Sequence, residues 1–158
     1  MKRLMLAAMI ATIAGQAQAL SCAPPDIART FNWAAAAEES YIVLNGSFSF
    51  EPLPRTRASQ LAPETMSRDA VFEGSYLGVE GFKAAPSLDV TLTFVCLGPW
   101  CGSMGNDGDD ILVFAQQSAN GYVLEIDPCY STIFAPSDDN IDRVEACMRG
   151  ESCEAVPF

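Results

Sequence analysis

The stretch from Ser87 to Cys129 constrains the fold of this chain more than any other part of the sequence. Across residues 88–94, apolar side chains alternate with polar ones, which is the period expected of a strand with one buried face. Residues 111–115 are all apolar, as in a strand buried on both faces. Asn120-Gly121 then gives a strong hairpin signal, because both residues tolerate a positive φ, and residues 122–126 alternate again. The stretch therefore predicts three strands, the last two joined by a tight turn.

Two more strands are expected earlier in the chain, at Tyr41–Phe50 and Val71–Val79. Gly46 marks a bulge or a sharp bend in the first, and glycines at alternate positions in the second suit a strand that coils at a barrel corner. Residues 51–69 are expected to form a Pro-rich loop, and residues 81–86 a connection. Five short strands suit a small closed barrel, so the fold is predicted to be mainly β.

One helix is expected before these strands and one after them. Asp26 can cap a helix from about Ile27 to Glu38, in which apolar residues recur at helical spacing and Trp33 is expected to cover the core. Ser137 can cap the second helix, whose first turn is acidic, and Gly150 follows its end in the usual C′ position. The second helix and the tail behind it are expected to pack on the barrel.

Residues 1–19 are expected to be an export signal that is cleaved near Ala19. They begin with two basic residues, continue with an apolar segment too short to span a bilayer, and end in Ala17-Gln18-Ala19. An alternative is a lipoprotein acylated at Cys22. No later segment is long and apolar enough for a membrane-spanning helix. The chain is therefore expected to be periplasmic or secreted, with residues 20–135 as the barrel domain and residues 136–158 as a helical C-terminal part.

The charge of the chain excludes some partners. The formal net charge is −11, and it becomes −13 once a signal with two of the nine basic residues and none of the twenty acidic ones is removed. Such a surface repels nucleic acid and anionic membrane surfaces. It suits solubility outside the cytoplasm or a basic partner.

The six cysteines are expected to form three disulfides, because an even number in an exported chain is typical of a disulfide framework. Fifteen pairings are possible. The chain has no His and no Cys-x-x-Cys pair, so we expect no zinc site and no cofactor. The cysteines are Cys22, Cys96, Cys101, Cys129, Cys147 and Cys153.

No catalytic motif is found, and the chain is not expected to be an enzyme. Without His, the common acid–base and triad chemistries lack their usual base. The segment from Cys101 to Gly105 differs from the Gly-x-Ser-x-Gly spacing of a nucleophile elbow. The acidic turn at residues 105–110 could offer oxygen ligands to calcium, but it lacks the EF-hand spacing, and a solvated turn is favoured.

The order of these motifs resembles that of the netrin-type (NTR) domain, the family of the tissue inhibitors of metalloproteinases (TIMP). The resemblance covers approximately residues 20–134 and implies a five-stranded closed OB-type barrel. Cys22-Ala-Pro-Pro25 is similar to the amino-terminal Cys-x-Pro-Pro segment of the inhibitors. The other matching segments are Ala36–Gly46, Cys101-Gly102, Gly108, Asp110–Ala115 and Tyr122–Cys129.

The resemblance also implies a pairing of the cysteines. In the family, the second cysteine pairs with the one that ends the last strand, which corresponds here to Cys22 with Cys129. Cys101 has lost its family partner and is then expected to pair with Cys96. Cys153 follows Cys147 by six residues, just past the end of the second helix, so these two are expected to form a local disulfide. The competing set joins Cys22 to Cys101 and Cys96 to Cys129.

The inhibitors begin with Cys-x-Cys, and their first cysteine chelates the protease zinc, but Leu20 stands at that position here. We therefore expect a non-catalytic binding module for an unknown protein partner, with metalloprotease inhibition as the alternative. The resemblance places the contact surface at the barrel end formed by residues 20–22, 51–69 and 96–101. Trp100 is expected either to contact a partner or to cap the barrel. The expected contact residues are Leu20, Ser21, Arg55, Arg57 and Trp100.

Overall fold

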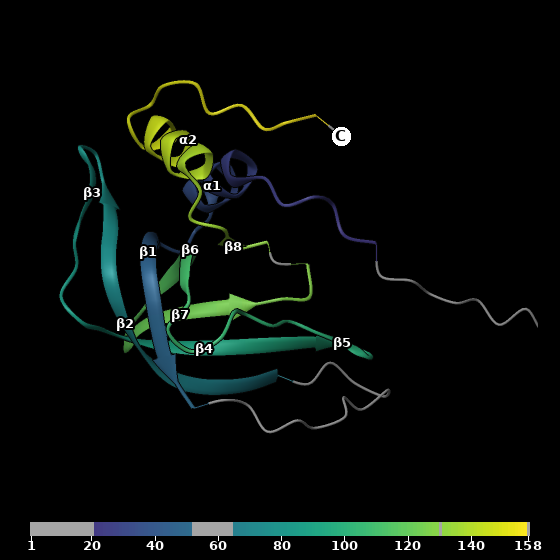
Figure 1. Ribbon diagram of the computed structural model, residues 1–158. Helices are drawn as coiled ribbons and strands as arrows, with labels where there is room; N and C mark the ends of the chain where they lie inside the picture. Colours follow the sequence, from purple (N-terminus) through teal and green to yellow (C-terminus); the bar gives the residue numbers. More distant parts are fainter. Residues whose placement is uncertain (1–20, 52–64, 130, 158) are drawn as a thin grey trace, which may run out of the picture.

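The computed structural model describes residues 21–51, 65–129 and 131–157 (Figure 1). The expected export signal, Leu20, Arg55 and Arg57 lie outside the described residues. The elements in chain order are α1 (Ile27–Ala36), β1 (Tyr41–Phe50), β2 (Thr65–Gly78), β3 (Gly81–Ala84), β4 (Leu88–Leu97), β5 (Trp100–Cys101), β6 (Asp110–Ser118), β7 (Gly121–Ile126), β8 (Ile133–Phe134) and α2 (Asp138–Met148).

Five of the strands close a barrel. Each of the neighbours β1–β2, β2–β4, β6–β7 and β1–β6 pairs antiparallel, and β4 pairs with β7 in parallel. The ring therefore runs β1-β2-β4-β7-β6 and returns to β1, which is the five-stranded, closed Greek-key arrangement of an OB-type barrel. The prediction of a mainly β fold with such a barrel, one helix near the N-terminus and one at the C-terminal end is confirmed.

The tightest approach between two barrel strands lies where Gly46 of β1 pairs with Gly74 of β2. A Cβ atom on Gly46 would lie 2.2 Å from the carbonyl oxygen of Glu73, and one on Gly74 would lie 2.4 Å from that of Asn45. No side chain fits between the two backbones, so both positions require glycine. The expected bend at Gly46 thus serves the strong coiling that closes the sheet.

Strand β6 separates two hydrophobic cores. Val113 and Ala115 point into the barrel with Leu44, Leu92 and Leu124, among others. Leu112 and Phe114 point the other way, into a second cluster that lies under the helices. All four of these β6 side chains are buried, which explains why the segment has no polar alternation and confirms that both faces of this strand are covered.

The helices begin as the sequence predicts. The Asp26 carboxylate accepts the backbone N–H of Arg29 at 2.8 Å, and the Ser137 hydroxyl accepts that of Asn140 at 3.3 Å. α1 and α2 pack against each other on one side of the barrel (Figure 1). No helix among the described residues is long and apolar enough to cross a membrane.

Three details of the expected fold are wrong. β2 begins at Thr65 rather than at Val71, because its first residues extend past β1 and pair with β4, Thr65 opposite Val95. The expected connection at 81–86 contains β3, which pairs with the end of β2. Trp33 does not cover the core, because half of it is exposed and its ring lies against Tyr41 with the centroids 4.9 Å apart.

Candidate functional site

Two disulfides lie at one end of the barrel. Cys96 and Cys101 pair across the β4–β5 hairpin, and Cys22 pairs with Cys129, three residues after the end of β7. Gly102 connects the two regions: its N–H donates to the carbonyl oxygen of Val95 at 2.8 Å, and its backbone lies directly against that of Ile126. The first residues of the described chain are thereby tied to the closing strands of the barrel.

A shallow apolar groove of about 380 Å³ opens at this end. Its apolar walls are Phe50 at the end of β1, Phe94 near the end of β4, and Met104 in the loop between β5 and β6. All three side chains belong to or pack against the barrel core, and Phe50 and Met104 remain partly accessible. The groove is therefore an opening of the barrel interior toward solvent.

The acidic turn at residues 105–110 fixes the loop that carries Met104 against β1. The Asp107 carboxylate accepts the N–H of Phe50 at 3.1 Å, and the N–H of Gly108 donates to the carbonyl oxygen of Phe48 at 3.1 Å. The Asp109 carboxylate accepts both the backbone N–H and the side-chain amide of Asn106, at 2.7 and 3.0 Å. Within the described ranges, no three His, Cys, Asp or Glu side chains group as metal ligands would. Asp107 thus acts as a hydrogen-bond acceptor that joins the loop to β1, and Asp109 as one that holds the loop to itself.

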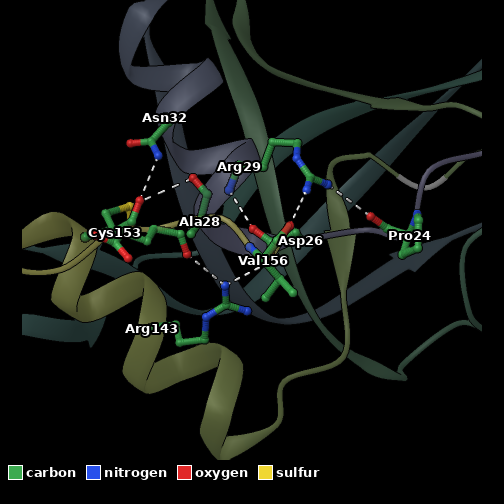
Figure 2. A network of polar contacts seen from close by, with 10 residues as sticks. Pro24, Asp26, Ala28, Arg29, Asn32, Arg143, Cys153 and Val156 are labelled. Atoms are coloured by element: carbon green, nitrogen blue, oxygen red, sulfur yellow. Dashed lines mark hydrogen bonds and ion pairs between the residues drawn. A yellow bond between two sulfur atoms is a disulfide. The ribbon is translucent and has the colours of Figure 1, made fainter. Parts of the chain in front are cut away.

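A polar network fixes the segment that leads from Cys22 into α1 (Figure 2). Arg143 of α2 and the backbone N–H of Val156 donate to the Asp26 carboxylate at 2.8 and 3.3 Å. Arg29 donates to the carbonyl oxygens of Pro24 and Val156, at 3.3 and 2.8 Å. The exposed residues 21–25 are therefore held by a disulfide on one side and by this network on the other.

The charge of Asp26 depends on that network. Burial acts to raise the pKa of its carboxyl group, but the hydrogen bonds from Arg143, Arg29 and Val156, together with the positive charge of Arg143, outweigh burial and lower the pKa below its ordinary value of 3.8. Because the folded-state pKa is the lower one, the stabilisation is present above the unfolded-state pKa and is lost as the pH falls through the folded-state value.

Asp26→Asn is expected to reduce the free energy of unfolding at pH 7 by roughly 1.5–3 kcal/mol, the range for a hydrogen bond to a charged group. Asparagine still caps a helix, so the loss reports the charge and not the cap. Urea denaturation from pH 7 down to pH 2 measures it. The difference from the unmodified chain should shrink below pH 4 and vanish at the acid end.

Asp142→Asn is the matched control, because Asp142 is an exposed carboxylate beside Arg143 and no ion pair among the described residues uses it. It should change the free energy of unfolding by less than about 0.5 kcal/mol. A loss for Asp26→Asn that does not depend on pH would contradict the assigned role of the carboxylate.

The described residues include only part of the surface that the sequence predicts. Ser21 is exposed next to Cys22, and Trp100 is 43% exposed at the tip of the β4–β5 hairpin, so it does not close the barrel end as a buried cap.

Cys147 and Cys153 lie away from this surface, where their disulfide joins α2 to the tail. The structure has the three expected disulfides, Cys22–Cys129, Cys96–Cys101 and Cys147–Cys153, and neither bond of the competing set.

Sequence analysis missed the apolar groove. Phe50 and Phe94 were recognised only as strand residues, and the available signal for the groove was Met104, a single large apolar residue in a loop of Gly, Ser, Asn and Asp.

Comparison of the chain with protein-family models, with curated proteins and with solved structures finds no match. The resemblance to the NTR domain therefore rests on the order of the motifs and stays a prediction.

Proposed function

We propose that this protein is an exported, non-catalytic binding module that holds a segment of a protein partner at the barrel end. The observation that carries the proposal is the apolar groove between Phe50, Phe94 and Met104, open to solvent and continuous with the core. Apolar concave sites are the usual places where proteins bind ligands or partner side chains.

The surroundings of the groove support a protein as the partner. Exposed Leu97 and Trp100 face each other on the hairpin that leads into Gly102, which itself lines the groove. Large exposed apolar side chains beside a groove are typical of contact surfaces, where Trp is especially frequent. The three disulfides indicate an oxidising environment, and this supports a partner outside the cytoplasm.

The resemblance to the NTR domain adds a second candidate, inhibition of a metalloprotease through the N-terminal segment. Residues 21–25 are exposed and fixed near both ends, which favours it because a preorganised segment loses little entropy on binding. If Leu20 is the first residue, its free amino group could approach a metal. Adding one glycine before Leu20 should then abolish inhibition of a zinc protease, whereas it should not affect binding in the groove.

Met104→Gln is expected to weaken binding of the partner about tenfold, since a buried apolar contact at an interface contributes on the order of 1–2 kcal/mol. The partner is first isolated from a periplasmic extract with the immobilised protein, and its affinity is then measured by calorimetry. Val79→Gln is the matched control: Val79 is 69% exposed in the β2–β3 turn, and it does not line the groove. Equal affinities for the two variants would place the binding surface elsewhere.

A further inference from the structure

A second apolar hollow lies on the other side of the β1–β6 pair, beside the helices. Its floor is Val43 and Phe114, which are 4% and 1% exposed, and its walls are Phe31 and Ala34 of α1, Tyr41 of β1 and Met148 of α2. Its volume is about 190 Å³. Sites for cofactors and drug-sized ligands are usually larger, about 300–1,000 Å³, so this hollow has the size for a single large side chain.

Tyr41 connects this hollow with an exposed aromatic surface. Its ring lines the hollow and contacts the ring of Trp33, with the centroids 4.9 Å apart and the planes tilted by 58°. Trp33 is 50% exposed, so one part of its ring system rests on Tyr41 while the rest faces solvent. An exposed Trp ring is the aromatic surface that Lys and Arg side chains bind best.

Two carboxylates add negative charge at the same place. Glu39 lies two residues before Tyr41 in the chain. Tyr41 pairs with Gln116 and Gln116 with Val123, so Glu125, two residues after Val123 on β7, lies on the same face of the sheet as Tyr41. Burial raises the pKa of the Tyr41 hydroxyl, and the charges of these two carboxylates act in the same direction. Both glutamates are exposed, and neither forms an ion pair with any basic side chain in the described residues. Arg149, which follows Met148, is already paired with Glu145 and Glu151.

We propose that this hollow is a second docking site, specific for a basic protein segment. One aliphatic side chain of the segment enters the hollow, and a neighbouring Lys or Arg lies on Trp33 and pairs with Glu39 and Glu125. The complementarity of charge selects this occupant. The hollow itself is apolar, and Glu39 and Glu125 beside it are negatively charged and form no ion pair within the described residues. The hollow shares no lining residue with the groove at Met104, so a negative result for this second site does not affect the proposed function.

The test uses Trp33 as its own reporter. The chain has two tryptophans, so in a Trp100→Phe background all tryptophan emission comes from Trp33. The probe is the peptide acetyl-Lys-Leu-Lys-amide. Acetyl-Glu-Leu-Glu-amide is its charge-reversed counterpart, and acetyl-Lys-Ala-Lys-amide lacks the leucine side chain that should enter the hollow. The basic Leu peptide should change the emission in a saturable way, and the other two should bind at least about tenfold more weakly.

Two sets of variants locate the binding. Ala34→Met fills the hollow and should weaken the basic peptide about tenfold, whereas Ala36→Met, on the same helix but outside the hollow, should not. Glu39→Gln and Glu125→Gln should each weaken it about two- to fivefold, while Glu38→Gln, an adjacent exposed carboxylate, is the control. The glutamate variants leave the packing of the helices intact, so they remain informative even if Ala34→Met disturbs the fold.

Equal binding of the basic and the acidic peptides overturns the proposal, and so does binding that Ala34→Met leaves unchanged. A shift of Trp33 emission with protein concentration alone, without peptide, would mean that a second copy of the chain occupies the surface. That outcome also overturns it.

Discussion

Replacing Cys22 and Cys129 together with alanine is expected to lower the free energy of unfolding by about 5 kcal/mol. Their disulfide closes a loop with a sequence separation of 107, and in the chain-entropy model the constraint that a disulfide places on the unfolded chain grows with the logarithm of the loop length. The bond also ties the segment before α1 to the chain that follows β7. Urea denaturation of the variant at pH 7 measures the loss, with the other two disulfides intact.

The matched control is the double replacement Cys147→Ala with Cys153→Ala. This disulfide has a sequence separation of only 6, so the same relation gives a loss of about 2 kcal/mol. The ratio of the two losses is the informative quantity, since both variants remove the same atoms. If the long-range disulfide stabilises the chain no more than the local one, loop closure is not its main contribution.

Sequence reasoning located those elements whose signals are local. β1 was expected at Tyr41–Phe50 and has those bounds, because its residues and its glycine bend are specific to a coiled strand. The second helix was expected from Ser137 onward, because an N-cap, an acidic first turn and a C′ glycine all lie within a few residues of its ends. Local propensity and tertiary packing agree at these places.

The errors lie where long-range pairing decides the structure. The first residues of β2 include Ser67, Arg68 and Asp69, whose polarity suggests a loop, but β4 continues beside them and supplies backbone hydrogen-bond partners. The partner of these residues cannot be inferred from the residues themselves. β3 was missed for a different reason: it pairs with the end of β2 across a tight turn at residues 79–80, and its four residues are too few to show an alternating pattern.

The candidate site was harder to predict than the fold. Asp26 and Arg143 are 117 residues apart, and nothing near either of them in the sequence indicates the ion pair. The groove depends on how Phe50, Phe94 and Met104 come together from three separate parts of the chain. The short spacing of Cys147 and Cys153 indicated their disulfide, but the pairing of Cys22 with Cys129 was accessible only through the resemblance to a known family, since six cysteines alone allow fifteen pairings.

Gly102→Ala is expected to destabilise the protein by more than about 4 kcal/mol, or to prevent folding. A Cβ atom at this buried position would lie 1.8 Å from the carbonyl oxygen of Ile126 and 2.5 Å from its carbonyl carbon. Backbone atoms cannot rotate away as a side chain does, so the β4–β5 hairpin would have to separate from the end of β7. Thermal or urea unfolding of the purified variant, or its absence from the soluble fraction, gives the result.

Gly78→Ala is the matched control for this substitution, because a Cβ atom there meets nothing closer than 3.6 Å. It should leave the free energy of unfolding within about 1 kcal/mol of the unmodified chain, with a small stabilisation from the reduced entropy of the unfolded state. A stable Gly102→Ala protein would mean that the hairpin does not rest on β7. The groove beside Gly102 would then lack the contact that holds it open, and the proposed binding surface would lose its structural basis.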